Sequence, residues 1–405
     1  MKSKIIAAAL FTFTAGGIAF YPAIKNVGAV ATPPPDPIVH VPVVDPVTQK
    51  RPTIEVVFAL DTTGSMGGLI QAAKEKIWSI ATTMSQAQPA PEIRMGLVAY
   101  RDRGDVYVTQ VVDLSDDLDS MYATLMDFRA GGGGDGPESV NQALYDAVHR
   151  ISWSQDKDAY RVVFLVGDAP PHMDYQDDVK YPQTLAVAKS RDIVVNTIQA
   201  GDSRATRNVW MKIAQAGYGL YAQVEQTGNA VAIATPYDKR LAELSAKMDE
   251  TRLYYGSAAE KAKRQLKQDA ARKLHESASV ESRARRATFN ATKSGENNFL
   301  GEGELIEDVS SGRVDLDSLK PESLPAPLQA MAPAEQKAAI EEAAERRAEL
   351  KSEIQELAAQ RADFLKEKVN AVGGASASLD HKLYGAIRDQ AGKKGMHYEA
   401  DTPAY

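Results

Sequence analysis

An apolar run that ends in an acid is the feature that most constrains this chain. Residues 56–60 are all apolar, with no polar alternation, and Asp61 follows directly. Such a run predicts a strand buried on both faces, as in a parallel sheet. Because open α/β sheets bind ligands at the carboxyl ends of their strands, Asp61, Thr63 and Ser65 are expected to form a site. One carboxylate and two hydroxyls are an all-oxygen donor set, suited to Mg²⁺ or another hard cation such as Mn²⁺ or Ca²⁺.

Strand-like and helix-like segments alternate between residues 53 and 237. We expect strands at 54–60, 93–100, 107–113, 161–167, 193–199 and 219–224. We expect helices at 67–87, 116–129, 138–151, 180–190, 204–216 and 228–234. This alternation predicts an α/β fold with a doubly wound, mainly parallel sheet flanked by helices.

The N-terminus has the layout of a bacterial export signal. Lys2 and Lys4 precede an uncharged, mostly apolar run over 5–20, and Ala31 ends a small-x-small cleavage site. Residues 1–31 are therefore expected to be a signal peptide or, if uncleaved, an N-terminal membrane anchor. Either case puts the remaining chain in the periplasm or at the cell surface. Residues 32–52 contain seven prolines and predict an extended linker.

Strand signals stop after residue 237, where a helical extension over 238–372 and a flexible tail over 373–405 are expected. A basic segment, 260–286, and an acidic segment, 296–322, either pair with each other or form two solvated surfaces. Residues 333–371 predict one long helix. Arg347 and Arg361 interrupt its apolar seam, which favours a helix packed on its neighbour over a long coiled coil.

Two further loops are expected to meet Asp61 in space. One is glycine-rich, runs from Gly131 to Glu138 and contains Asp135. The other places Asp168 at the end of the strand 161–167. Asp135 is also suited to cap the following helix, with Glu138 reaching back to it, and capping is compatible with metal contact. The nearby segment 100–103 and His172 have two interpretations: they line the rim of the site, or, as is more usual for such loop residues, they are solvated.

These three elements resemble the metal-ion-dependent adhesion site of a von Willebrand factor type A domain. That site has Asp-x-Ser-x-Ser, a Thr or Asp in a second glycine-rich loop, and an Asp that ends a later strand. Asp61, Thr63 and Ser65 match the first element, Asp135 falls where Thr is usual, and Asp168 matches the third. The resemblance covers about 53–237. It implies that the roles are divided as follows: Thr63 and Ser65 bind the cation directly, Asp61 and Asp168 act through water or through those hydroxyls, Asp135 reaches in, and one position stays open for a ligand.

The expected function is divalent-cation-dependent binding of a protein or glycan at the bacterial cell envelope. The acids Asp61, Asp135 and Asp168 total −3 against +2, so we expect a neutral oxygen ligand to be preferred over a carboxylate. The net charge of −7 argues against nucleic acid. An enzyme is not expected. A phosphohydrolase of the haloacid-dehalogenase type remains an alternative, although Thr63 stands where it needs a second Asp. An envelope scaffold that binds through its C-terminal helices is the other.

Overall fold

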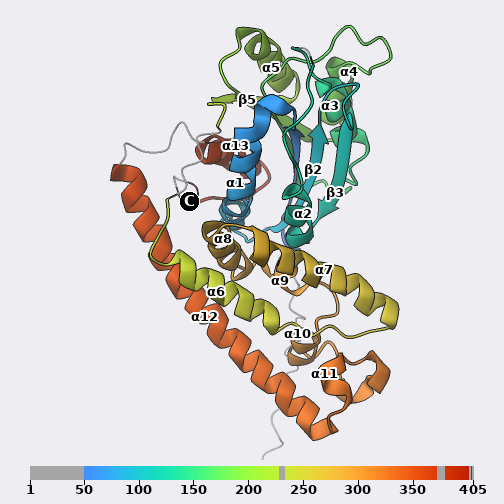
Figure 1. The fold of residues 1–405 in the computed structure, drawn as a ribbon, viewed down its shortest axis with the longest axis vertical. Coiled ribbons are helices and arrows are strands. Elements are labelled where there is room, and N and C mark those ends of the chain that lie inside the picture. The colour runs from blue at the N-terminus through green and yellow to red at the C-terminus, as the bar shows by residue number, and fades with distance from the viewer. Residues whose placement is uncertain (1–49, 135, 228–232, 372–378, 401–402, 404–405) are drawn as a thin grey trace, which may run out of the picture. The chain divides into compact units, whose positions relative to one another are not determined.

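A six-stranded sheet has the strand order β3-β2-β1-β4-β5-β6 (Figure 1). Its strands are β1 (Thr53–Asp61), β2 (Glu92–Tyr100), β3 (Thr109–Ser115), β4 (Tyr160–Gly167), β5 (Ile193–Ala200) and β6 (Tyr218–Val224). The pairs are parallel except for β2 and β3, which are antiparallel. All six strands and the fold class are therefore confirmed. The structure, a computed structural model, describes residues 50–134, 136–227, 233–371, 379–400 and 403.

Some predicted segments lie outside the described residues. They are the signal or anchor (1–31), nearly all of the linker, most of the helix expected at 228–234, and Asp135. Among the helices that are described, none combines the length and the apolar character needed to cross a membrane.

Helices cover both faces of the sheet. Val56 and Phe58 of β1 share one apolar core with α1 (Gly67–Ser85) and α2 (Leu118–Leu125). Val57 and Ala59, which point the opposite way, join a second core. That core is completed by helices α3 (Val140–His149), α4 (Tyr181–Ser190) and α5 (Arg204–Ala216). Successive side chains of a strand alternate between faces, so a run that is apolar throughout is what a two-sided burial requires.

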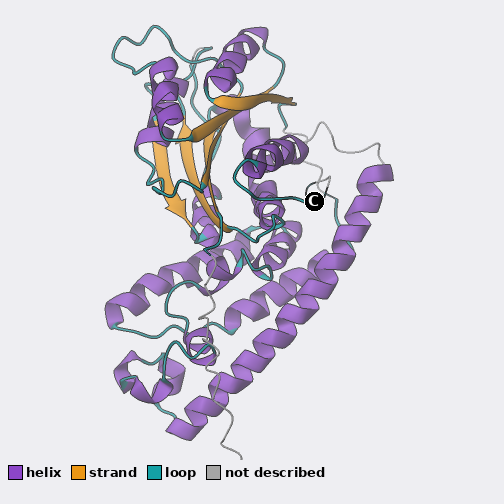
Figure 2. Ribbon diagram, turned by 180° about the vertical axis from the view of Figure 1, so that it is seen from behind, coloured by secondary structure: helices purple, strands orange, loops and turns teal. Residues whose placement is uncertain are grey.

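The C-terminal region is helical and packs along one long helix (Figure 2). Its helices are α6 (Asp238–Glu250), α7 (Ala258–Ser277), α8 (Val280–Asn290), α9 (Glu296–Leu300), α10 (Leu305–Ser310), α11 (Ala326–Gln329) and α12 (Pro333–Ala371). Helix α12 packs against α6, α8 and α10, as the interrupted seam predicts. The two arginines of the seam are buried against acids: Arg347 lies 2.9 Å from Glu304 and Arg361 lies 2.7 Å from Asp238.

This helical extension is not a separate body. Residues from Lys50 onward form one compact unit. Leu274 of α7 and Phe289 of α8 belong to the same apolar core as Trp78 of α1. Part of the basic segment is solvated, as one alternative predicts, but two of its lysines pair with acids that flank α2: Lys267 lies 2.7 Å from Asp117, and Lys273 lies 2.7 Å from Asp127.

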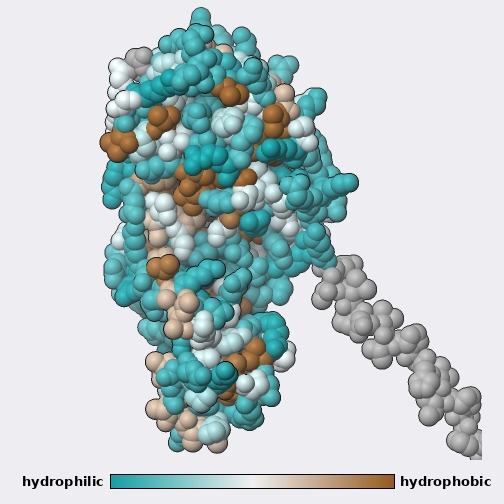
Figure 3. Space-filling model, turned by 90° about the vertical axis from the view of Figure 1, so that its right-hand side faces the viewer, coloured by the Kyte–Doolittle hydropathy of each residue, from teal (hydrophilic) through white to brown (hydrophobic). Residues whose placement is uncertain are grey.

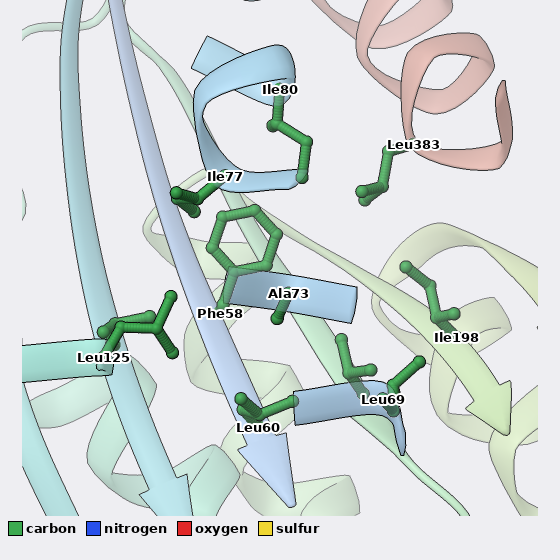
Figure 4. A pocket seen from close by; sticks show the side chains of 11 residues that line it. Phe58, Leu60, Leu69, Ala73, Ile77, Ile80, Leu125, Ile198 and Leu383 are labelled. Carbon is green, nitrogen blue, oxygen red and sulfur yellow. The ribbon is translucent and has the colours of Figure 1, made fainter. Parts of the chain in front are cut away.

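The prediction of a flexible tail is wrong for residues 379–392, which form helix α13 (Leu379–Gly392). Leu383, Tyr384 and Ile387 are buried. Figure 4 shows Leu383 facing an apolar cavity of about 30 Å³ between β1 and α1. The Gly-, Ala- and Ser-rich composition of the preceding stretch obscured the helical spacing of these apolar residues.

Polar contacts also hold α13 on the sheet. The Gln390 and Asn196 amides bind each other through two hydrogen bonds of 3.0 and 2.7 Å. The Tyr160 hydroxyl donates to the same Gln390 oxygen at 2.6 Å. At the other end of α13, Asp380 and Lys76 of α1 form a buried ion pair of 2.6 Å. The polar pairs fix one position of the helix, which apolar contacts alone do not do.

The Gln390→Leu variant tests this docking. It leaves the Asn196 amide and the Tyr160 hydroxyl buried without their partner, so we expect a loss of about 1–3 kcal/mol in the free energy of unfolding. Urea unfolding followed by circular dichroism measures the change. Gln360→Leu, on an exposed position of α12, is the matched control. Equal unfolding midpoints for the two variants would show that α13 contributes nothing through its amide.

Candidate metal centre

The predicted site lies at the carboxyl end of β1. At this strand the order of the sheet reverses, because the strands that follow β1 are added first on one side of it and then on the other. Strand β1 pairs with β2 on one side and with β4 on the other. The register places Asp61 beside Tyr100, and Leu60 beside Val166. The loops that follow β1 and β4 therefore emerge side by side, as expected at the switch point of a doubly wound sheet.

Three oxygen donors converge in the loop after β1. One Asp61 oxygen, Oδ1, accepts hydrogen bonds from the backbone N–H of Thr63 at 2.8 Å and from its hydroxyl at 2.7 Å. The Thr63 hydroxyl lies 3.5 Å from that of Ser65. Asp61 and Thr63 are buried, whereas Ser65 is exposed at the mouth of the site. The spacing of two residues thus turns all three side chains toward one point.

Asp168 lies beside this loop, as predicted. Gly167 precedes it, and a Cβ atom there would come within 2.9 Å of Asp61 Cβ and 2.5 Å of the Tyr100 hydroxyl. Gln226, from the segment after β6, donates to Asp168 Oδ2 at 2.7 Å and to the Ser65 carbonyl at 3.1 Å. Gln226 was not predicted, because nothing local in the sequence shows that the end of β6 reaches the site.

The glycine-rich loop docks on the first loop through its backbone. Gly64 donates to the Gly132 carbonyl at 3.2 Å, and Gly131 donates to the Thr62 carbonyl at 3.1 Å. Gly132 has a φ of 79°, and a Cβ atom on it would lie 2.2 Å from Asp105. The positive φ favours glycine here, and a side chain would also displace the Asp105 carboxylate. The neighbouring Asp135, the fifth predicted site residue, lies outside the described residues.

The first two residues after β2, Arg101 and Asp102, are buried rather than solvated, whereas Arg103 is exposed. Arg101 donates to the Thr62 carbonyl at 3.1 Å and to the Arg129 carbonyl at 2.6 Å, and so ties the first loop to the second. Asp102 accepts from Ser139 at 2.9 Å. His172 is also buried, and its Nε2 lies 3.2 Å from Asp102. These residues form a buried wall beside the site, so the interpretation that they line it is favoured over the solvated one.

Glu138 is the second residue that sequence reasoning missed at this site. It was expected to cap a helix, but α3 begins at Val140 and Ser139 is the residue before it. The side chain of Glu138 is instead buried near the first loop. A Cβ atom on Gly133 would lie 3.2 Å from Glu138 Oε1 and 3.3 Å from Thr63 Cβ, so the carboxylate and Thr63 flank the same glycine.

Burial and mutual repulsion perturb both acids. Burial raises the pKa of Asp61 to about 7, against the opposing hydrogen bonds from Thr63, and the charge of Asp168 raises it further. Burial and the charges of Asp61 and three other acids raise the pKa of Glu138 to about 9. Asp61 Oδ2 and Glu138 Oε2 are buried without a hydrogen-bond partner. Without a positive charge in the site, Asp61 and Glu138 therefore do not both ionise at neutral pH.

A divalent cation fits these residues. Every donor is a hard oxygen, and a cation supplies the positive charge that the two unpartnered carboxylate oxygens need. Across the described ranges no three His, Cys, Asp or Glu side chains converge closely enough to chelate a metal by themselves. A cation here therefore depends on the hydroxyls of Thr63 and Ser65 together with the acids.

Comparisons with known proteins agree with this architecture. Residues 55–236 match the family model described as von Willebrand factor A domain. An ariadne-like RING finger protein of Acanthamoeba polyphaga mimivirus is 23% identical over 160 residues, which are 40% of this chain and 15% of that protein. The alpha-protein kinase vwkA of Dictyostelium discoideum is 29% identical over 121 residues, 29% of this chain and 19% of that protein. This chain thus spans less than a fifth of either relative.

Among solved structures, similarity is confined to part of the chain. Proximal thread matrix protein 1 from the mussel byssus, with a zinc-occupied MIDAS motif, gives a TM-score of 0.34 at 14% identity and covers 43% of this chain and 42% of its own. The SpRpn10 VWA domain gives 0.33 at 12% identity and covers 45% of this chain and 100% of its own.

Proposed function

We propose that the region 55–236, which matches the von Willebrand factor A family, holds a divalent cation and uses it to bind a protein or glycan ligand. One observation carries the proposal. Asp61 fixes the Thr63 hydroxyl through Oδ1 at 2.7 Å, while its Oδ2 stays buried and unpartnered next to Ser65 and Asp168. A buried carboxylate without a partner is costly, and a cation at this point removes the cost.

The residues of the site have separate tasks. Asp61 accepts a hydrogen bond from the Thr63 hydroxyl, so the lone pairs of that oxygen are free to face the cation. Ser65 supplies a second hydroxyl at the exposed mouth, and Gln226 orients Asp168. A bound Mg²⁺, Mn²⁺ or Ca²⁺ would offer an open coordination position to an oxygen atom of the ligand. This is binding chemistry, and we propose no enzymatic reaction.

The rim of the site supports a macromolecular ligand. Val106 is 90% exposed and Met173 is 48% exposed, on the loops that follow β2 and β4. Arg103 joins these loops through ion pairs to Asp177 at 2.8 Å and Asp178 at 2.5 Å. Figure 3 shows one face of the molecule, where apolar patches are separated by hydrophilic surface. Exposed apolar side chains on a braced rim suit a protein or a sugar ring more than a small ion.

We further propose that this binding takes place at the bacterial cell envelope. The basic and apolar N-terminal segment supports export, either as a cleaved signal peptide or as an anchor in the membrane. The proline-rich residues 32–52 would then act as a spacer between the membrane and the binding region.

A pull-down from envelope extract tests the function. Wild-type protein with Mg²⁺ is expected to capture a partner that is lost with chelator and lost in Asp61→Ala. Asp202→Ala changes an exposed acid on the loop that follows β5 and serves as the matched control, which should capture normally. If capture survives both chelator and Asp61→Ala, the cation is not used for binding. The exposed face of α12, in which only seven of 39 residues are buried, then becomes the candidate surface.

A further inference from the structure

Glu138 is held in place by the segment that follows Asp168. Its backbone N–H donates to the Pro170 carbonyl at 2.9 Å, and its carbonyl accepts from His172 at 3.1 Å. These two bonds form a parallel bridge between Glu138 and Pro171. The residue is therefore anchored to the third loop of the site, and its position does not depend on the flexible glycines before it.

The side chain of Glu138 points inward without a partner. The residue is 4% exposed, and Oε2 is buried with no hydrogen bond. A helix cap would place the carboxylate against backbone N–H groups, which would satisfy it. Here the acid instead faces the Thr63 side of the site, across Gly133. Nothing among the described contacts offsets this cost.

We propose that Glu138 is a third carboxylate at the cation site, behind the oxygens that hold the ion, and supports the bound ion through a water molecule. The inference rests on the proposed cation binding. Its role differs from that of Asp135, because Glu138 reaches the site from the bridge to the third loop. Among the described acids, Glu138, Asp61 and Asp168 together give −3 against +2, so the loaded site has little attraction for a further carboxylate. The ligand group that binds there is a neutral oxygen, such as a carbonyl or a hydroxyl.

The isosteric variant Glu138→Gln separates this role from a structural one. Calorimetric titration of the full chain with Mn²⁺ should show at least a tenfold weaker affinity than wild type, the range seen when supporting residues of metal sites are lost. In chelator, the variant should unfold at the same temperature as wild type or higher, because an unpaired buried acid has been removed. A purely structural glutamate would instead lower the stability and leave the affinity unchanged.

Two further variants fix the interpretation. Asp174→Asn removes one exposed negative charge near the site and should stay within about twofold of the wild-type affinity, because exposed charges are well screened. Asp61→Asn should bind no Mn²⁺. The assignment of Glu138 is overturned if Glu138→Gln binds Mn²⁺ like wild type while Asp61→Asn does not bind it. It is also overturned if Asp174→Asn loses as much affinity as Glu138→Gln. In both cases the cation site itself remains. If wild type binds no cation, the proposed function itself falls.

Discussion

Replacing Arg286 by Met is expected to lower the free energy of unfolding by about 3–5 kcal/mol. Arg286 on α8 donates to both oxygens of Asp119 on α2, at 2.6 and 2.5 Å. Both side chains are at most 1% exposed. The variant leaves the Asp119 carboxylate buried in the interface without its counter-charge. Asp249, the other acid on Arg286, keeps Arg252 at 3.1 Å and His275 at 2.7 Å.

Urea unfolding of three variants distinguishes the lost pair from a general loss of charge. Arg272→Met removes an exposed arginine of α7 and should change stability by less than about 1 kcal/mol. The double variant Arg286→Met, Asp119→Leu removes both charges and should recover a large part of the loss, because an apolar pair of similar size can replace a buried ion pair. A double variant as unstable as Arg286→Met would show that the shape of the arginine, and not the stranded acid, sets the stability.

The same ion pair shows why the extension looked like a separate domain in the sequence. Asp119 and Arg286 are 167 residues apart, and each lies in a segment rich in charge. A charged residue on a helix is normally predicted to face solvent. Arg286 is buried only because α8 packs against the sheet region, and the sequence does not show that packing. The strand pattern ends near residue 237, where the secondary structure changes to helices. The apolar core does not end there, because the helices after residue 237 pack on those before it.

The sheet was predictable because its signal is local. A strand covered on both faces must be apolar throughout, so a run such as 162–166 is recognised as a strand without knowledge of the strands beside it. The first metal loop is equally local, because Asp61, Thr63 and Ser65 act at fixed short spacing. Asp168 was found because it ends such a run, and the ends of parallel strands share one edge of the sheet.

The parts that sequence reasoning missed depend on tertiary contacts. Glu138 has the same local pattern as a helix cap, and only its bridge to Pro171 turns it into the site. Gln226 is one of many surface-like polar residues until β6 brings it to Asp168. Helix α13 follows a stretch with the composition of a linker, and its burial arises from Asn196 and Lys76, both far away in the chain.

Divalent cations are expected to stabilise this protein more at about pH 8.5 than at about pH 5.5. In the folded, cation-free protein the pKa of Asp61 rises from 3.8 to about 7, chiefly through burial. Between these two values the folded state keeps a proton that the unfolded chain has released, so the free energy of unfolding falls as pH rises through this window and stays low above it. The full shift in the pKa of Asp61 corresponds to about 4 kcal/mol of unfolding free energy, of which about 2 kcal/mol is lost between pH 5.5 and pH 8.5. Glu138, with a pKa of about 9, continues the decline.

A bound cation reverses this loss, because it supplies the positive charge that the proton supplied at low pH. Calorimetric melting with Mg²⁺ and with chelator at both pH values measures the effect as the difference between two unfolding temperatures. In Asp61→Asn the carboxyl no longer titrates and the cation is no longer held, so both the decline in chelator and the rescue by Mg²⁺ should shrink. An equal rescue at both pH values in wild type would mean that the cation does not replace a proton on Asp61, and that the buried acids are satisfied in some other way.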